Sequence, residues 1–84
     1  MARVTIFTTS WCGFCRAAKA FLDGRGIEYE EIVFDGEPAF RARLHELTGG
    51  WTVPQILIDN RPIGGYTELR RLAAEGRLDE LLAA

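Results

Sequence analysis

The chain has two cysteines, Cys12 and Cys15, which are separated by two residues within the stretch TTSWCGFCRAAKAF. A Cys-x-x-Cys pair can supply half of a structural zinc site, or it can act as a dithiol that opens and closes in thiol–disulfide exchange. A structural zinc ion needs four ligands, and His45 is the only histidine that could join the two sulfurs. The sequence therefore favours a redox dithiol over a zinc site.

The position of the two cysteines predicts that they are chemically unequal. Apolar residues recur on one face of residues 14–23, which predicts a helix there, with Cys12 just before it and Cys15 in its first turn. The unpaired N–H groups and the dipole of a helix N-terminus favour a thiolate at Cys12, and Arg16 and Lys19 add positive potential. We expect Cys12 to attack substrate disulfides and the shielded Cys15 to resolve the resulting mixed disulfide.

The remaining elements follow from apolar periodicity and turn signals. We expect Thr67 to cap the third helix and a final helical piece to follow it. The order β-α-β-α-β-β-α predicts an α/β fold, a four-stranded mixed sheet flanked by helices. Beside the helix at 14–23, the expected ranges are strands at 4–8, 28–34, 55–59 and 62–63, and helices at 38–48 and from 67 to about 76.

Length and charge bound the class of protein. Eighty-four residues predict one domain, spanning residues 1–84, and we expect a monomer. The net charge is -2 and the ten basic residues are scattered, which disfavours nucleic acid and anionic membranes as partners. No apolar run is long enough to span a membrane, and the first strand leaves no room for a signal peptide. The expected compartment is therefore the reducing cytoplasm, where structural disulfides are rare.

Three motifs in this order and over this length resemble the glutaredoxin family, and especially its small bacterial dithiol members. They are Cys-Gly-Phe-Cys at residues 12–15, Thr-Val-Pro at 52–54 and Gly-Gly-Tyr at 64–66. The resemblance covers the chain from about residue 4 to residue 82. It implies a thioredoxin-like fold and thiol–disulfide exchange with glutathione as co-substrate, without a metal.

The resemblance also implies where glutathione binds. The Val53–Pro54 peptide bond should be cis and lie beside Cys12, where its backbone can pair with the extended glutathione backbone. Residues 65–67 should grip the γ-glutamyl end, and we expect aromatic side chains, Trp51 among them, to crowd the site. The implied glutathione-binding residues are Trp11, Phe14, Thr52, Val53, Pro54, Gly65, Tyr66 and Thr67.

The chain departs from the family pattern at three positions. Related proteins often carry a lysine where this chain has Thr9, a basic residue at the position of Gly50, and an aspartate at that of Thr67. The missing cations leave the glycyl carboxylate of glutathione without an obvious partner. Arg16, Arg41 or the region of Trp51 could substitute for them.

Two alternatives remain open at this point. The dithiol could draw electrons from thioredoxin reductase or another thiol donor, or two chains could share a [2Fe-2S] cluster through Cys12 and two glutathiones. The expected protein partners are disulfide-containing or glutathionylated proteins, with ribonucleotide reductase as one candidate. We expect no role in the chemistry for His45.

Overall fold

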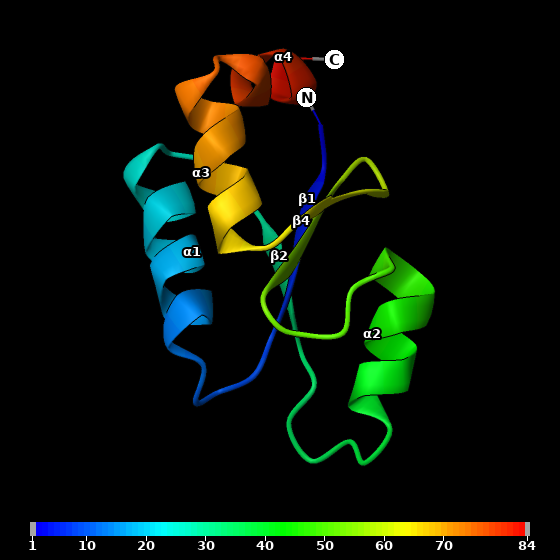
Figure 1. Ribbon diagram of the computed structural model, residues 1–84. Helices are drawn as coiled ribbons and strands as arrows, with labels where there is room; N and C mark the ends of the chain where they lie inside the picture. The colour runs from blue at the N-terminus through cyan, green and yellow to red at the C-terminus, as the bar shows by residue number, and fades with distance from the viewer. Residues whose placement is uncertain (1, 84) are drawn as a thin grey trace.

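The order of elements in the structure, a computed structural model that describes residues 2–83, is the predicted one, with a short helix closing the chain (Figure 1). The elements are β1 (Val4–Thr8), α1 (Gly13–Gly24), β2 (Glu30–Val33), α2 (Phe40–Thr48), β3 (Gln55–Ile58), β4 (Arg61–Gly64), α3 (Tyr66–Ala74) and α4 (Arg77–Ala83).

The four strands form one mixed sheet in the order β2-β1-β3-β4. β1 runs parallel to β2 and antiparallel to β3, and β3 pairs antiparallel with β4. Asp59 and Asn60 connect β3 to β4 with positive φ angles of 50° and 66°, a two-residue turn that such small polar residues tolerate. The predicted thioredoxin-like arrangement is confirmed.

Helices cover both faces of the sheet. Alternation along β1 turns Val4 and Ile6 toward the face covered by α1, α3 and α4, while Phe7 points toward α2. Figure 1 shows α1 and α3 on one side of the strands and α2 on the other. The larger cluster of buried residues is Val4, Ile6, Ala18, Leu22, Ile56, Ile58, Leu69 and Leu78, and the smaller one is Phe7, Phe34, Leu44 and Leu57.

Two elements, α2 and β2, begin two residues later than predicted. α2 begins at Phe40 rather than at Pro38, because the Phe40 N–H donates to the Glu37 carbonyl (3.2 Å) and closes a turn over the intervening residues. β2 covers only Glu30–Val33 rather than residues 28–34. The chain before it diverges from β1, whose pairing with β2 begins at Thr5 opposite Glu30.

The sheet register brings the three sequence motifs together at one end. The last residues of β1 lead toward the cysteines, and Phe7 on that strand lies opposite Gln55, which directly follows the Thr-Val-Pro motif. Ile56 pairs with Gly64, the first residue of the Gly-Gly-Tyr motif. Antiparallel pairing thus places motifs that lie up to fifty residues apart along the chain beside the start of α1.

Candidate active site

Cys12 is the N-cap residue of α1 and is half-buried. Its sulfur accepts a hydrogen bond from the backbone N–H of Cys15, with an N···S distance of 3.1 Å. Such a bond, together with the helix dipole, stabilises a sulfur that carries negative charge. The structure therefore places Cys12 where the sequence predicted, at the end of the helix that favours a nucleophilic thiolate.

Cys15 lies in the first turn of α1 and is only 1% exposed. Burial, followed by the side-chain hydrogen bond with Cys12, raises the pKa of the Cys15 thiol to about 12. A thiol with so high a pKa stays protonated near neutral pH and is a poor nucleophile. The two sulfurs thus differ in exposure as the spacing predicted, because Cys12 is half-buried and Cys15 is buried.

The Val53–Pro54 peptide bond is cis, as the resemblance implied, and lies against the dithiol. The Cys12 thiol donates to the Val53 carbonyl oxygen, with an S···O distance of 3.7 Å. The backbone on either side of this peptide therefore borders the reactive sulfur and can meet any extended chain bound to it.

A groove of about 190 Å³ opens between the cis-proline segment and the start of α3. It brings together seven of the eight residues expected to bind glutathione, and leaves out Trp11. Trp11 and Phe14 are 77% and 66% exposed, which excludes a purely structural role in the core for either ring. The Phe14 ring lies 6.2 Å from that of Tyr66, between centroids. The groove is lined by Phe14, Thr52, Val53, Pro54, Gln55, Gly65, Tyr66, Thr67 and Glu68.

Two glycines shape the wall of the groove that leads into α3. Gly64 has a φ of +106°, and a Cβ at Gly65 would lie only 3.1 Å from the Pro54 carbonyl oxygen. The Gly65 N–H donates to Glu68 Oε1 at 2.7 Å, so Gly65 is the N-cap residue of α3. The prediction that Thr67 caps this helix was therefore wrong. The N-cap residue is Gly65, and the carboxylate of Glu68 accepts the hydrogen bond from its N–H group.

The first turn of α3 offers donors to an anion. An α-helix leaves its first N–H groups without partners inside the helix, and those of Tyr66 and Thr67 belong to this turn. Both residues line the groove. A carboxylate placed there would meet free N–H groups and the positive end of the helix dipole.

The structure explains why position 50 has no cationic side chain. An ideal Cβ at Gly50 would lie 2.6 Å from Gln55 Cδ, so the amide of Gln55 fills the space that a side chain at position 50 would need. Gln55 Nε2 is held in place by the Thr52 carbonyl at 2.9 Å. Close by, Arg41 Nη1 donates to the Trp51 carbonyl at 2.9 Å, which brings a guanidinium next to the start of the groove wall.

The sequence misplaced Trp51 and missed two groove residues. The Trp51 ring stacks on His45 on α2, with 3.9 Å between centroids and 9° between planes, rather than lining the groove. Glu68 could have been found from its place three residues after Gly65, the spacing of a capping box. Gln55 had no such signal, because its role depends on the empty space at Gly50.

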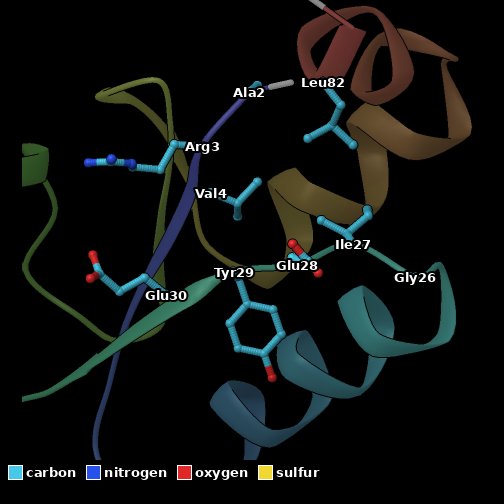
Figure 2. Close-up of a pocket in the computed structure, with 9 residues that line it drawn as sticks. All are labelled: Ala2, Arg3, Val4, Gly26, Ile27, Glu28, Tyr29, Glu30 and Leu82. Atoms are coloured by element: carbon cyan, nitrogen blue, oxygen red, sulfur yellow. The ribbon is translucent and has the colours of Figure 1, made fainter.

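A larger hollow lies at the other end of the sheet, where β1 and β2 begin (Figure 2). It measures about 730 Å³ and is lined by residues at the start of β1, the start of β2 and the end of α4, whereas Cys12 follows the other end of β1. Figure 2 shows Arg3 and Glu30 pointing away from the apolar side chains of Val4, Ile27 and Leu82. Of the two, only the smaller groove is lined by a residue in contact with the Cys12 sulfur, which is Val53.

Two further features concern residues 2–83 as a whole. No three side chains of His, Cys, Asp or Glu in this part of the chain lie close enough together to hold a metal ion. None of its helices has the length and hydropathy needed to cross a lipid bilayer.

Comparison with known proteins agrees with the geometry. Residues 4–63 match the family model described as Glutaredoxin. The chain is 44% identical to a glutaredoxin of Pseudomonas aeruginosa over the full length of both, and 44% identical to glutaredoxin 3 of Escherichia coli over 98% of this chain and 99% of that one.

Solved structures give the same result. A buckwheat glutaredoxin–glutathione complex superposes with a TM-score of 0.87 at 30% identity, covering 98% of this chain and 77% of that one. The solution structure of a Brucella melitensis glutaredoxin gives 0.83 at 41% identity, covering 98% and 89%. With its dithiol at the helix N-terminus beside a cis-proline, the chain belongs to the glutaredoxin family of glutathione-dependent thiol–disulfide oxidoreductases.

Proposed function

We propose that this protein reduces glutathionylated proteins and protein disulfides, with Cys12 as the nucleophile, Cys15 as the resolving thiol and the groove as the glutathione site. The supporting observation is the position of the Cys12 sulfur. It lies at the N-terminus of α1, 3.7 Å from the Val53 carbonyl oxygen, where the groove begins. A glutathione whose sulfur is bonded to Cys12 would lie along that groove.

The groove suits the three parts of glutathione. Its cysteinyl backbone would run beside Val53, whose peptide group borders the dithiol. The γ-glutamyl carboxylate would accept from the N–H groups of Tyr66 and Thr67 at the start of α3. The glycyl carboxylate would lie near Arg41, whose guanidinium has donors beyond the one bonded to the Trp51 carbonyl. This arginine would replace the cations absent at positions 9 and 50.

Deglutathionylation needs only Cys12. Its thiolate attacks the glutathione sulfur of the substrate, a bond forms between the two sulfurs, and the client leaves as a thiolate that takes up a proton. A second glutathione thiolate then attacks the glutathione sulfur held on Cys12. Glutathione disulfide is released and the Cys12 thiolate is restored, so each cycle oxidises one free glutathione, the other half of the disulfide having come from the substrate.

Protein disulfides require both sulfurs. Cys12 forms a mixed disulfide with one sulfur of the client, and Cys15 attacks Cys12 to release the reduced client. The resulting Cys12–Cys15 disulfide is then reduced by two glutathiones in succession. The 1% exposure of Cys15 keeps it away from other thiols while leaving it one helical turn from Cys12.

The first test uses the oxidised protein. It is mixed with excess glutathione alone, quenched with acid at successive times and weighed by intact mass spectrometry. The proposal predicts a glutathione adduct on Cys12 followed by the free dithiol. A disulfide that persists with glutathione but yields to thioredoxin reductase and NADPH would refute glutathione as the reductant.

A second test addresses the glutathione site. Arg41→Ala should raise the KM for glutathione about fivefold and leave kcat unchanged, as expected for the loss of one exposed ion pair of about 1 kcal/mol. Arg43→Ala is the matched control, because Arg43 lies on the same helix but pairs with Glu37 at 3.3 Å. Equal KM values for the two variants would remove Arg41 from the proposed site.

A further inference from the structure

Resolution by Cys15 poses an electrostatic problem that the structure makes concrete. The sulfur is 1% exposed, and it must become a thiolate to attack Cys12. While Cys12 is free, its charge and its hydrogen bond with Cys15 both raise the pKa of the Cys15 thiol, in addition to burial. Both contributions of Cys12 disappear once its sulfur is bonded to glutathione or to a client.

Two influences that favour the Cys15 thiolate do not depend on the state of Cys12. A backbone hydrogen bond from Thr9 and the positive charge of Lys19 both lower the pKa of Cys15. Lys19 lies four residues after Cys15 on α1, and side chains at this spacing share one face of a helix. Of the two influences, the lysine can be removed without altering the backbone.

Lys19 is fixed rather than free. Its Nζ lies 2.9 Å from Glu31 Oε2 on β2, and the same oxygen accepts from the Thr8 hydroxyl at 2.6 Å. Thr8 is fully buried at the end of β1, so the chain of contacts is anchored in the sheet. A lysine side chain would otherwise sample many rotamers, and the anchor keeps its charge near the dithiol.

The charged state of this arrangement is constant over the working pH range. Glu31 raises the pKa of Lys19 above its ordinary value, so the ammonium is protonated near neutral pH. Lys19 first, and Thr8 second, lower the pKa of Glu31, so that carboxylate is ionised near neutral pH. Among residues 2–83, the titratable groups that act on the pKa of Cys15 or Lys19, besides these two themselves, are Cys12, Tyr29 and Glu31, and Asp23 acts in turn on that of Tyr29.

We propose that Lys19, held in place by Glu31 and Thr8, is a positioning residue for the resolution step, whose fixed charge lets Cys15 ionise once Cys12 has entered a mixed disulfide. The inference rests on the proposed function and assigns a part of it to a residue outside the groove. In the step itself, the Cys15 thiolate attacks Cys12 and a Cys12–Cys15 bond forms. The bond from Cys12 to glutathione breaks, and the leaving glutathione thiolate takes up a proton equivalent to the one Cys15 lost.

The test follows the glutathione adduct of the reduced protein after mixing with glutathione disulfide. Acid quenching and intact mass give the rate at which the adduct forms and the rate at which Cys15 resolves it, from pH 6.5 to 8.5. In the native protein the resolution rate should rise about tenfold per pH unit, as for attack by a largely protonated thiol. Lys19→Met should slow resolution about five- to tenfold at each pH, as expected for the loss of one partly screened charge.

Two variants separate charge from structure. Lys19→Arg keeps the charge and should restore most of the rate. Arg43→Met removes one cation on α2 together with its ion pair to Glu37, and this variant should resolve the adduct at the native rate. Equal resolution rates in Lys19→Met and the native protein would overturn the inference, as would failure of Lys19→Arg to restore the rate.

The Cys15→Ser variant, which cannot resolve the adduct, tests the proposed function independently of Lys19. If this variant forms the adduct on Cys12 and excess glutathione removes it, the proposed function stands whatever Lys19 does. If no adduct forms, the proposed function itself fails. In Lys19→Met, the rate of adduct formation could fall by the same factor as the rate of resolution. That result would mean that the lysine acts on Cys12, and it would refute the inference.

Discussion

Gly50→Ala tests whether Gln55 fills the space left by the absent side chain at position 50. An ideal Cβ on Gly50 would lie 2.6 Å from Gln55 Cδ, closer than two carbon atoms can approach. Gln55 is 8% exposed, and its amide donates to the Thr52 carbonyl at 2.9 Å. The new methyl group must therefore push a buried, hydrogen-bonded side chain out of place.

The cost can be worked from these contacts. Losing one hydrogen bond to a neutral acceptor costs about 1 kcal/mol, and forcing an extra methyl into a filled space costs about 1–3 kcal/mol. Alanine also lowers the conformational entropy of the unfolded chain, which stabilises the folded state by about 0.4–1 kcal/mol. We expect the free energy of unfolding to fall by about 2 kcal/mol, the sum of these opposing effects.

Urea denaturation followed by tryptophan fluorescence measures this change. Gly24→Ala is the matched control, because no atom lies within 4 Å of a Cβ at that position, and it should unfold at or slightly above the native midpoint. Combined with Gln55→Ala, which removes the obstructing amide, Gly50→Ala should cost much less than it does alone. Additive costs, or a Gly50→Ala variant as stable as Gly24→Ala, would refute the account of position 50.

An ion pair, a side-chain hydrogen bond and a left-handed glycine give three further predictions. Lys19 lowers the pKa of Glu31, so the contribution of this carboxylate to stability is complete above about pH 5 and is lost as the pH falls through its folded pKa. In Glu31→Gln the urea midpoint should therefore depend less on pH in this acid range than in the native protein. An equal dependence in both proteins would contradict this. Two hydrogen bonds from Ser10 lower the pKa of Asp35, and in Ser10→Ala the NMR titration of that carboxyl should move upward; an identical titration would contradict it. Gly64→Ala should destabilise the protein by about 1–3 kcal/mol in urea, because alanine at a φ of +106° is strained; a native midpoint would contradict it.

The elements predicted best are those whose residues carry a local signal. β1 is a continuous run of β-branched and aromatic residues, and α1 repeats Cys15, Ala18 and Leu22 on one side, so both ranges came within one residue of the observed ones. The turn at Asp59 and Asn60 is equally local, because these residues tolerate positive φ. In each case the physical cause lies within a few residues of its effect.

The boundaries that failed depend on contacts beyond the immediate residue. Pro38 is compatible with the first turn of a helix, but the carbonyl of Glu37 is already engaged by Phe40 in a tighter turn. Thr67 is a good capping residue by type, yet Glu68 supplies the bond to the chain before α3. For α3 the sequence permits either residue to supply the cap, and the close approach of Gly65 to the Pro54 carbonyl is a tertiary contact that the sequence does not reveal.

The site illustrates the same division at a larger scale. The unequal positions of the two sulfurs, one at the N-cap of α1 and one buried in its first turn, were predictable from their spacing at a helix start. The groove is different, because it exists only where the register of β3 against both β1 and β4 brings residues 52–54 and 64–67 beside Cys12. A family resemblance predicts that these segments lie together, but it does not predict which residue takes the place of one that the family has and this chain lacks. Here the amide of Gln55 fills the space at Gly50 without adding charge, and the proposed site takes its cation for the glycyl carboxylate from Arg41 on α2, whose guanidinium bonds to the Trp51 carbonyl.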